Sequence, residues 1–289
     1  MSWEYEGVFD TDMGADQDDL ISSYWRCFPS DIRVGQMGYR TKTTKAGPRL
    51  EAEIYPVYGR DKIQRLRDAK RNLTPEAQQR LNTERSDRHF VLLADGNFGR
   101  DDVHLTLTYK GETPDFDRAK KDVRNFLDRV KRLRKKMNLP ALKYLGAIEG
   151  CADGTRERIH VHMLLSGGIP REEMEMIWGK GYANADRLNP DENGLEAIAR
   201  YIVKQSRYGK MKYQKRWFAS RNLKQPKERT SDTKVSRTRV KKLAGDMLNE
   251  ARAIMERVYP GYDFVRCSVH GSSVVDGVYI RCVMRRDGA

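Results

Sequence analysis

The pattern of apolar and polar positions changes several times along this chain, and each change predicts an element. Residues 103–109 alternate between apolar and polar side chains, as expected of a strand with one buried face. From Phe116 to Met137 apolar residues recur every three or four positions, which predicts an amphipathic helix with a basic outer surface, opened by Thr113-Pro114. Residues 144–149 and 159–165 are apolar runs that predict two further strands, separated by a polar loop.

The next segment completes a recognisable order of elements. A short helix is expected from Pro170 to Trp178, a strand over 182–188 and a helix over 195–205. The order is strand, helix, strand, strand, helix, strand and one more helix. It predicts an α+β fold of the ferredoxin-like, split βαβ type, with a central antiparallel sheet and helices packed against one face.

The flanking segments predict additions to this core. Residues 36–59 indicate a hairpin, and Thr74-Pro75 indicates an N-cap and first turn of a helix through Leu81. A basic amphipathic helix is expected over 235–258, followed by a terminal hairpin. The predicted organisation is an acidic arm with an accessory hairpin and helix region over 1–95, a core over 96–226, and a helix and hairpin extension over 227–289.

Charge changes this picture by indicating a partner. The 289 residues carry a formal net charge of +14, which favours nucleic acid, although a basic protein without such a partner is the alternative. The charge is unevenly placed. Residues 1–20 hold seven acids and no Lys or Arg, whereas residues 200–242 hold sixteen Lys or Arg against two acids. An acidic arm and a basic block on one chain can attract each other.

Several classes of protein are disfavoured. The four cysteines show no C-x-x-C spacing, so neither a zinc knuckle nor a disulfide scaffold is indicated. No apolar run reaches the roughly 18 residues that a membrane helix needs, and the acidic N-terminus is unlike a signal peptide. We expect a cytoplasmic protein, in the host cytoplasm if a phage encodes it.

A histidine pair lies in the strand predicted over 159–165. His160 and His162 are two residues apart, so their imidazoles share one face. If this strand pairs with 144–149 as a hairpin, Glu149 lies across from His160. Two nitrogens and a carboxylate would hold a catalytic divalent cation, Mg²⁺ or Mn²⁺, with positions left for substrate oxygens. The alternative is two structural histidines and an ordinary acid, and His104 is expected to be structural.

A tyrosine and a lysine share one surface of the helix predicted over 195–205. Tyr201 falls at the border of the buried stripe, and Lys204 is its neighbour three residues on. A phenol can act as a covalent nucleophile, and an ammonium can stabilise developing charge on a phosphate. With 14 tyrosines in the chain, such a pair by itself also arises by chance.

Together these motifs resemble those of a known family. The strand Leu105-Thr106-Leu107-Thr108-Tyr109, the pair His160-Val161-His162 and the segment Tyr201-Ile202-Val203-Lys204 resemble, in this order, the three motifs of HUH-family rolling-circle replication initiators. The likeness is to replication-associated proteins of small single-stranded DNA phages and of plasmids. It covers roughly residues 97–226.

The resemblance implies a site-specific single-stranded DNA endonuclease and strand transferase. It assigns His160, His162 and Glu149 as metal ligands, Tyr201 as the nucleophile that forms a 5′-phosphotyrosine, and Lys204 as an assisting cation. Some members have a second tyrosine four positions on, but residue 205 is Gln and Tyr208 is a weak substitute. No G-x-x-x-x-G-K-[ST] motif is found, so host helicase and polymerase are expected as partners.

A basic run with interleaved aromatic residues follows the tyrosine helix. Cations that follow phosphates and rings that stack on bases suit single-stranded or hairpin origin DNA. The alternative is a solvated basic face with Trp217 and Phe218 in the core. Other functions left open are a non-catalytic nucleic-acid-binding regulator, a relaxase or tyrosine transposase, and an RNA-processing metalloenzyme. The predicted DNA contacts are Arg207, Lys210, Lys212, Lys215, Arg216 and Arg221.

Overall fold

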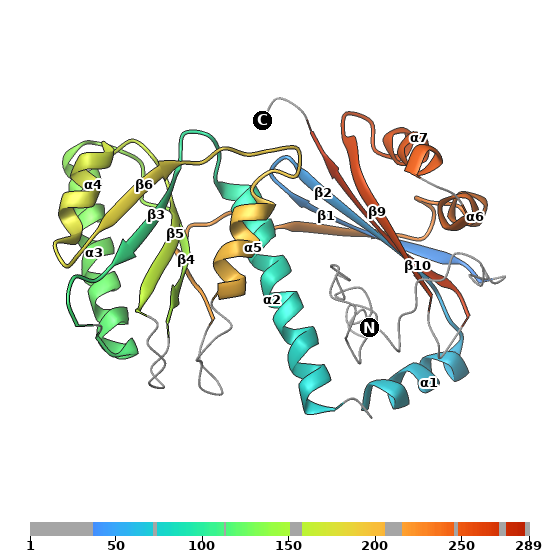
Figure 1. Ribbon diagram of the computed structural model, residues 1–289. Coiled ribbons are helices and arrows are strands. Elements are labelled where there is room, and N and C mark those ends of the chain that lie inside the picture. Colours follow the sequence, from blue (N-terminus) through green and yellow to red (C-terminus); the bar gives the residue numbers. More distant parts are fainter. Residues whose placement is uncertain are drawn as a thin grey trace. The chain divides into compact units, whose positions relative to one another are not determined.

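The computed structural model divides the chain into two compact units. Unit 1 combines Met1–His89 with Pro226–Ala289, and unit 2 is Phe90–Gln225. In the part of the chain that the structure describes, each unit contains a five-stranded antiparallel sheet (Figure 1). The predicted acidic arm and the loop over 151–157 lie outside the described residues. The structure describes residues 37–71, 74–112, 114–150, 158–205, 216–245, 248–271 and 276–286.

Unit 2 has the element order that the sequence predicts. Its sheet has the strand order β6-β3-β5-β4-β7, so β5 lies between β3 and β4 and splits the β3-α3-β4 unit. The short strand β7 was not predicted and adds a fifth strand beside β4. The elements are β3 Val103–Thr108, α3 Phe116–Lys136, β4 Tyr144–Glu149, β5 His160–Leu165, α4 Arg171–Trp178, β6 Ala183–Arg187, α5 Glu196–Gln205 and β7 Phe218–Ala219.

Helices cover both faces of the unit 2 sheet, so the prediction of helices on one face was wrong. Figure 1 shows α3 and α4 on one side and α5 with the end of α2 (Pro75–Asn97) on the other. One core joins α3 and α4 to residues such as Leu107 and Met163, and a second joins α5 and α2 to Leu145 and Leu164. Strands β4 and β5 are apolar on both faces, and such strands need cover on both faces.

The ends of α3 are fixed by polar contacts. Asp115 is the N-cap and accepts a hydrogen bond from the backbone N–H of Arg118 at 2.7 Å. At the other end Arg134 is buried, although its position in the basic outer surface predicts exposure. Its guanidinium donates to the carbonyl oxygens of Pro140, Ser166 and Gly167 at 2.9, 3.1 and 2.6 Å. This side chain therefore joins the end of α3 to the loops beyond it.

Unit 1 is built from both ends of the chain. Its strand order is β8-β1-β2-β10-β9, so the predicted N-terminal and C-terminal hairpins pair with each other through β2 and β10. The helix predicted over 235–258 is two helices, α6 and α7, which pack on one sheet face. The elements are β1 Tyr39–Ala46, β2 Arg49–Pro56, α1 Arg60–Arg71, β8 Lys227–Ser231, α6 Arg237–Gly245, α7 Leu248–Val258, β9 Asp263–Gly271 and β10 Val278–Arg285.

A buried charged cluster lies within unit 1. Glu51 is fully buried and forms ion pairs with Arg49, Arg88 and Arg281 at 2.7, 2.8 and 3.0 Å. Burial alone would raise the pKa of Glu51, but the three arginines together hold it well below its usual range. The carboxylate is therefore charged, and its charge is offset by neighbours on two strands and on α2.

Candidate functional site

One end of the unit 2 sheet brings together residues from three strands. Glu149 at the end of β4 is directly across from His160 at the start of β5, which confirms the predicted hairpin and its alignment. On the other side of β5, Thr108 is paired with His160 and Thr106 with His162. The side chains on this face of the sheet are thus set by strand register rather than by loops.

His162 is the most closely surrounded residue of this group, with a side chain that is 7% exposed. Its Nδ1 lies 3.1 Å from the hydroxyl oxygen of Thr106 and 3.3 Å from Nε2 of His104. The rings of His104 and His162 stack with centroids 5.4 Å apart. On the opposite side Nε2 lies 3.5 Å from Oε1 of Glu149. A proton on Nδ1 can be donated to the Thr106 hydroxyl, which leaves the Nε2 lone pair on the Glu149 side.

Burial keeps this imidazole neutral. Desolvation, with smaller contributions from His104 and His160, lowers the pKa of His162 to about 4. Burial also lowers the pKa of His104, although Asp186 opposes that shift. At neutral pH His162 therefore has a free lone pair, which is the form of histidine that binds metal ions.

Tyr201 reaches the same face of the sheet from α5. Its ring is edge-on to the ring of His162, with centroids 5.4 Å apart and an interplanar angle of 84°. The neighbouring residues Ile202 and Val203 are buried in the core against β4 and β5, whereas Tyr201 is 46% exposed. The packing of α5 therefore places the phenol beside the histidine while leaving it open to solvent. Lys204, one turn further on, is exposed.

The start of α5 is held by a buried acid. The backbone N–H of Leu195, just before the helix, donates to Oδ1 of Asp95 on α2 at 2.9 Å. Asp95 is 3% exposed. An anion at a helix N-terminus satisfies donors that have no partner within the helix. This contact fixes the position of α5 and with it the position of Tyr201.

The predicted metal ligands do not form a ready-made cluster. Among the described residues, no group of three or more His, Cys, Asp or Glu side chains is arranged to hold a metal ion. Glu149 and His162 approach each other, and His160 is near enough to affect the pKa of His162. His160, which is half-buried, is the predicted ligand that is least engaged.

The predicted DNA contacts are only partly described. Arg216 donates to the carbonyl oxygen of Val203 at 3.1 Å, which ties it to α5, and Arg221 is exposed. Trp217 packs edge-on against Phe90, and Phe218 lies beside Tyr144, so the packing alternative fits these two rings. The remaining predicted contacts, Arg207, Lys210, Lys212 and Lys215, lie outside the described residues, as does Tyr208.

Sequence reasoning missed the contacts of His104 and Thr106 with His162. The signal that was available is their spacing, since two residues two apart on an alternating strand share a face. Which strand would lie beside them could not be read from that spacing. The pairing of β3 with β5 supplies the missing information.

The comparisons with known proteins agree with this region. Residues 102–206 match the model of one family, that of the replication-associated protein ORF2. The match covers a little more than a third of the chain. Neither the curated proteins nor the solved structures yield a match. In the described parts of the chain, no helix is long and apolar enough to span a membrane. Residues 102–206 are thus similar to replication-associated proteins, and they include His104, Glu149, His160, His162 and Tyr201.

Proposed function

We propose that unit 2 is an HUH endonuclease core with a ferredoxin-like fold, and that the chain initiates rolling-circle replication by nicking single-stranded DNA. The observation that carries the proposal is the meeting of Tyr201, His162 and Glu149 at one end of the sheet. They come from α5, β5 and β4, which lie far apart in sequence. The split order of the strands and the match to replication-associated proteins support the same function.

In the proposed reaction the hydroxyl oxygen of Tyr201 attacks the phosphorus of a phosphodiester. The bond between the tyrosine oxygen and phosphorus forms, and the bond from phosphorus to the 3′ oxygen breaks. The proton of the phenol is lost to a base, and the leaving 3′ oxygen gains a proton. The products are a 5′-phosphotyrosine and a free 3′-OH. Because the phosphotyrosine is an ester of similar energy, attack by a 3′-OH rejoins the strand without ATP.

The donor atoms near Tyr201 fit a divalent cation. Two atoms bound to one ion at about 2.1 Å each cannot lie more than about 4.2 Å apart. Nε2 of His162 and Oε1 of Glu149 are 3.5 Å apart and meet this condition. We assign these two residues with His160 as the ligands of Mg²⁺ or Mn²⁺. A bound ion would stabilise negative charge on the phosphate oxygens.

Thr106 and His104 are assigned a positioning role. Both contact Nδ1 of His162, and a hydrogen bond at that nitrogen determines the tautomer that offers Nε2 to a cation. Lys204 is assigned the task of attracting the DNA phosphate, since its exposed ammonium lies one turn from Tyr201. The 3′-OH would be extended by a host polymerase, with a host helicase unwinding the duplex in the cytoplasm.

The proposal is tested by capture of the covalent adduct. The purified chain is incubated with Mn²⁺ or Mg²⁺ and a randomised library of 5′- and 3′-labelled single-stranded oligonucleotides, then separated under denaturing conditions. We expect a DNA-linked protein band that chelation with EDTA prevents. Using a library removes the need to know the origin sequence, and sequencing of the captured DNA would identify it.

The outcome also separates the alternatives. A regulator without catalytic activity would bind DNA whether or not EDTA is present and would form no adduct. A relaxase or tyrosine transposase would form the same adduct, but the captured sequences would map to a transfer origin or to transposon ends.

A further inference from the structure

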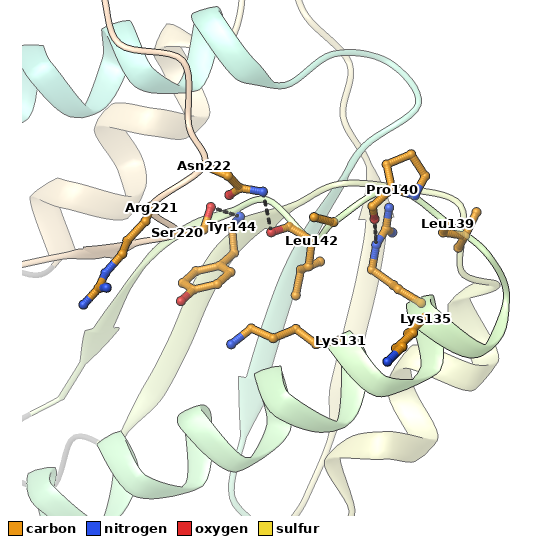
Figure 2. A pocket seen from close by; sticks show the side chains of 11 residues that line it. Lys131, Lys135, Leu139, Pro140, Leu142, Tyr144, Ser220, Arg221 and Asn222 are labelled. Atoms are coloured by element: carbon orange, nitrogen blue, oxygen red, sulfur yellow. Dashed lines mark hydrogen bonds between the residues drawn. The ribbon is translucent and has the colours of Figure 1, made fainter.

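A basic pocket lies at the end of the unit 2 sheet that is remote from Tyr201. Figure 2 shows it between the last turns of α3, the start of β4 and residues 220–222. Tyr144, which lines it, is the first residue of β4, whereas Glu149 is the last. Five steps along a strand correspond to roughly 17 Å. The pocket is therefore separate from the proposed nicking site.

The walls of the pocket are held in place by hydrogen bonds. The backbone N–H of Tyr144 donates to the Ser220 hydroxyl at 3.1 Å, and the N–H of Ser220 donates back to the Tyr144 carbonyl at 2.9 Å. The side-chain amide of Asn222 donates to the carbonyl oxygen of Leu142 at 3.2 Å (Figure 2). Arg134 fixes the opposite side through its bonds to backbone carbonyls. The pocket is thus formed without a ligand.

The charge of the pocket is positive. Its lining includes Lys131, Arg134, Lys135 and Arg221 and no Asp or Glu. Within the described residues the side chains of Lys135 and Arg221 are exposed and take part in no hydrogen bond or ion pair. Lys131 is partly offset by Asp128, which lies 2.9 Å from its ammonium. At least two cations are therefore available to an anionic ligand.

An aromatic ring lies among these cations. In the view of Figure 2, Arg221 and Lys135 are at the two ends of a row, with Tyr144 and Lys131 between them. The ammonium of Lys131 is 5.8 Å from the centre of the Tyr144 ring. Phe218 packs beside that ring at 6.2 Å between centroids. Cations spaced along a groove with a half-buried ring between them are what single-stranded nucleic acid requires.

We propose that this pocket is a second binding site for single-stranded DNA, which holds the strand away from the phosphate that is cut. Phosphates contact Arg221 and Lys135, and an unpaired base stacks on Tyr144. The volume of about 650 Å³ lies in the range of small-ligand pockets, about 300–1,000 Å³, which suits a nucleotide and not a duplex. The inference rests on the proposed function in taking single-stranded DNA as the substrate.

The test compares two double variants that remove the same charge. K135A/R221A removes the two cations of the pocket, and K121A/R124A removes two exposed cations from the preceding turns of α3. Binding of a 30-nucleotide mixed-sequence single strand to the full chain is followed by fluorescence anisotropy in EDTA, which prevents nicking. The measurement is repeated over a series of salt concentrations, and a circular dichroism melt confirms that each variant is folded.

We expect K135A/R221A to bind about tenfold more weakly at 0.1 M salt, and its plot of log affinity against log salt to be shallower by about 1.4. That decrease corresponds to two phosphate contacts at about 0.7 each on a single strand. K121A/R124A should stay within twofold of the unaltered chain. Tyr144→Leu should weaken binding about tenfold and leave the salt slope unchanged.

Equal effects of the two double variants would overturn the inference, because they would reflect net charge alone. Equal weakening for a duplex of the same length would overturn the single-strand assignment. Adduct formation separates this inference from the proposed function. If the chain forms no adduct while K135A/R221A alone weakens binding, the nuclease proposal fails and the second site stands.

Discussion

Acid should destabilise unit 2 through His162, and the size of the effect follows from its burial. The pKa of His162 is lowered from 6.5 to about 4, chiefly by desolvation, so the unfolded chain binds a proton at a pH where the folded chain does not. The penalty is absent above pH 6.5, grows as the pH falls, and is complete below about pH 4. The full shift corresponds to about 3 kcal/mol.

The expected measurement compares the unaltered chain with His162→Gln. Hydrogen exchange of peptides from β4 and β5 over a urea series reports the stability of unit 2 alone. Between pH 7.5 and 4.5 the unaltered chain should lose roughly 2–3 kcal/mol more than the variant. Lys121→Ala, a surface variant, should keep the pH dependence of the unaltered chain. The reasoning is refuted if His162→Gln loses stability with acid to the same extent as the unaltered chain.

Three further substitutions test other parts of the account. Glu51→Gln should destabilise unit 1 by about 3–5 kcal/mol in chemical unfolding, because three buried arginines lose their counter-charge; a loss below 1 kcal/mol would contradict this. Thr106→Val should slow adduct formation about tenfold or more at unchanged DNA affinity, since it removes the hydroxyl at Nδ1 of His162; an unchanged rate would remove its positioning role. Gly146→Ala should lower stability by about 1–3 kcal/mol, because an added Cβ would lie 2.5 Å from the carbonyl oxygen of His162; a thermal melt at the same temperature would show that the strands can move apart.

The parts of the fold that follow from local patterns could be predicted. Alternation over 103–109 gives β3, and the polar loop between two apolar runs gives the β4-β5 hairpin with Glu149 across from His160. The boundary of α2 was missed, since it was predicted to end at Leu81 and runs to Asn97. This helix has no continuous amphipathic stripe, because its last turns are buried on several sides. Periodicity does not detect such a helix.

Contacts between distant segments explain the rest of the differences. Strand β10 pairs with β2 across more than two hundred residues, and neither hairpin contains a signal for the other. Arg134 has the spacing of a surface residue, yet it is buried because three loop carbonyls accept its hydrogen bonds. In the candidate site, the face that carries His162 was predicted, but its contacts with His104 and Thr106 depend on β3 lying beside β5.

The central claim is that Tyr201 becomes covalently linked to DNA. The most direct measurement is adduct formation by the unaltered chain and by Tyr201→Phe, which removes one oxygen atom from a half-exposed side chain. Tyr182→Phe, at another exposed tyrosine, is the matched control. We predict an adduct with the unaltered chain and the control, none with Tyr201→Phe, and similar DNA affinity in all three. An adduct at normal yield with Tyr201→Phe would contradict the account.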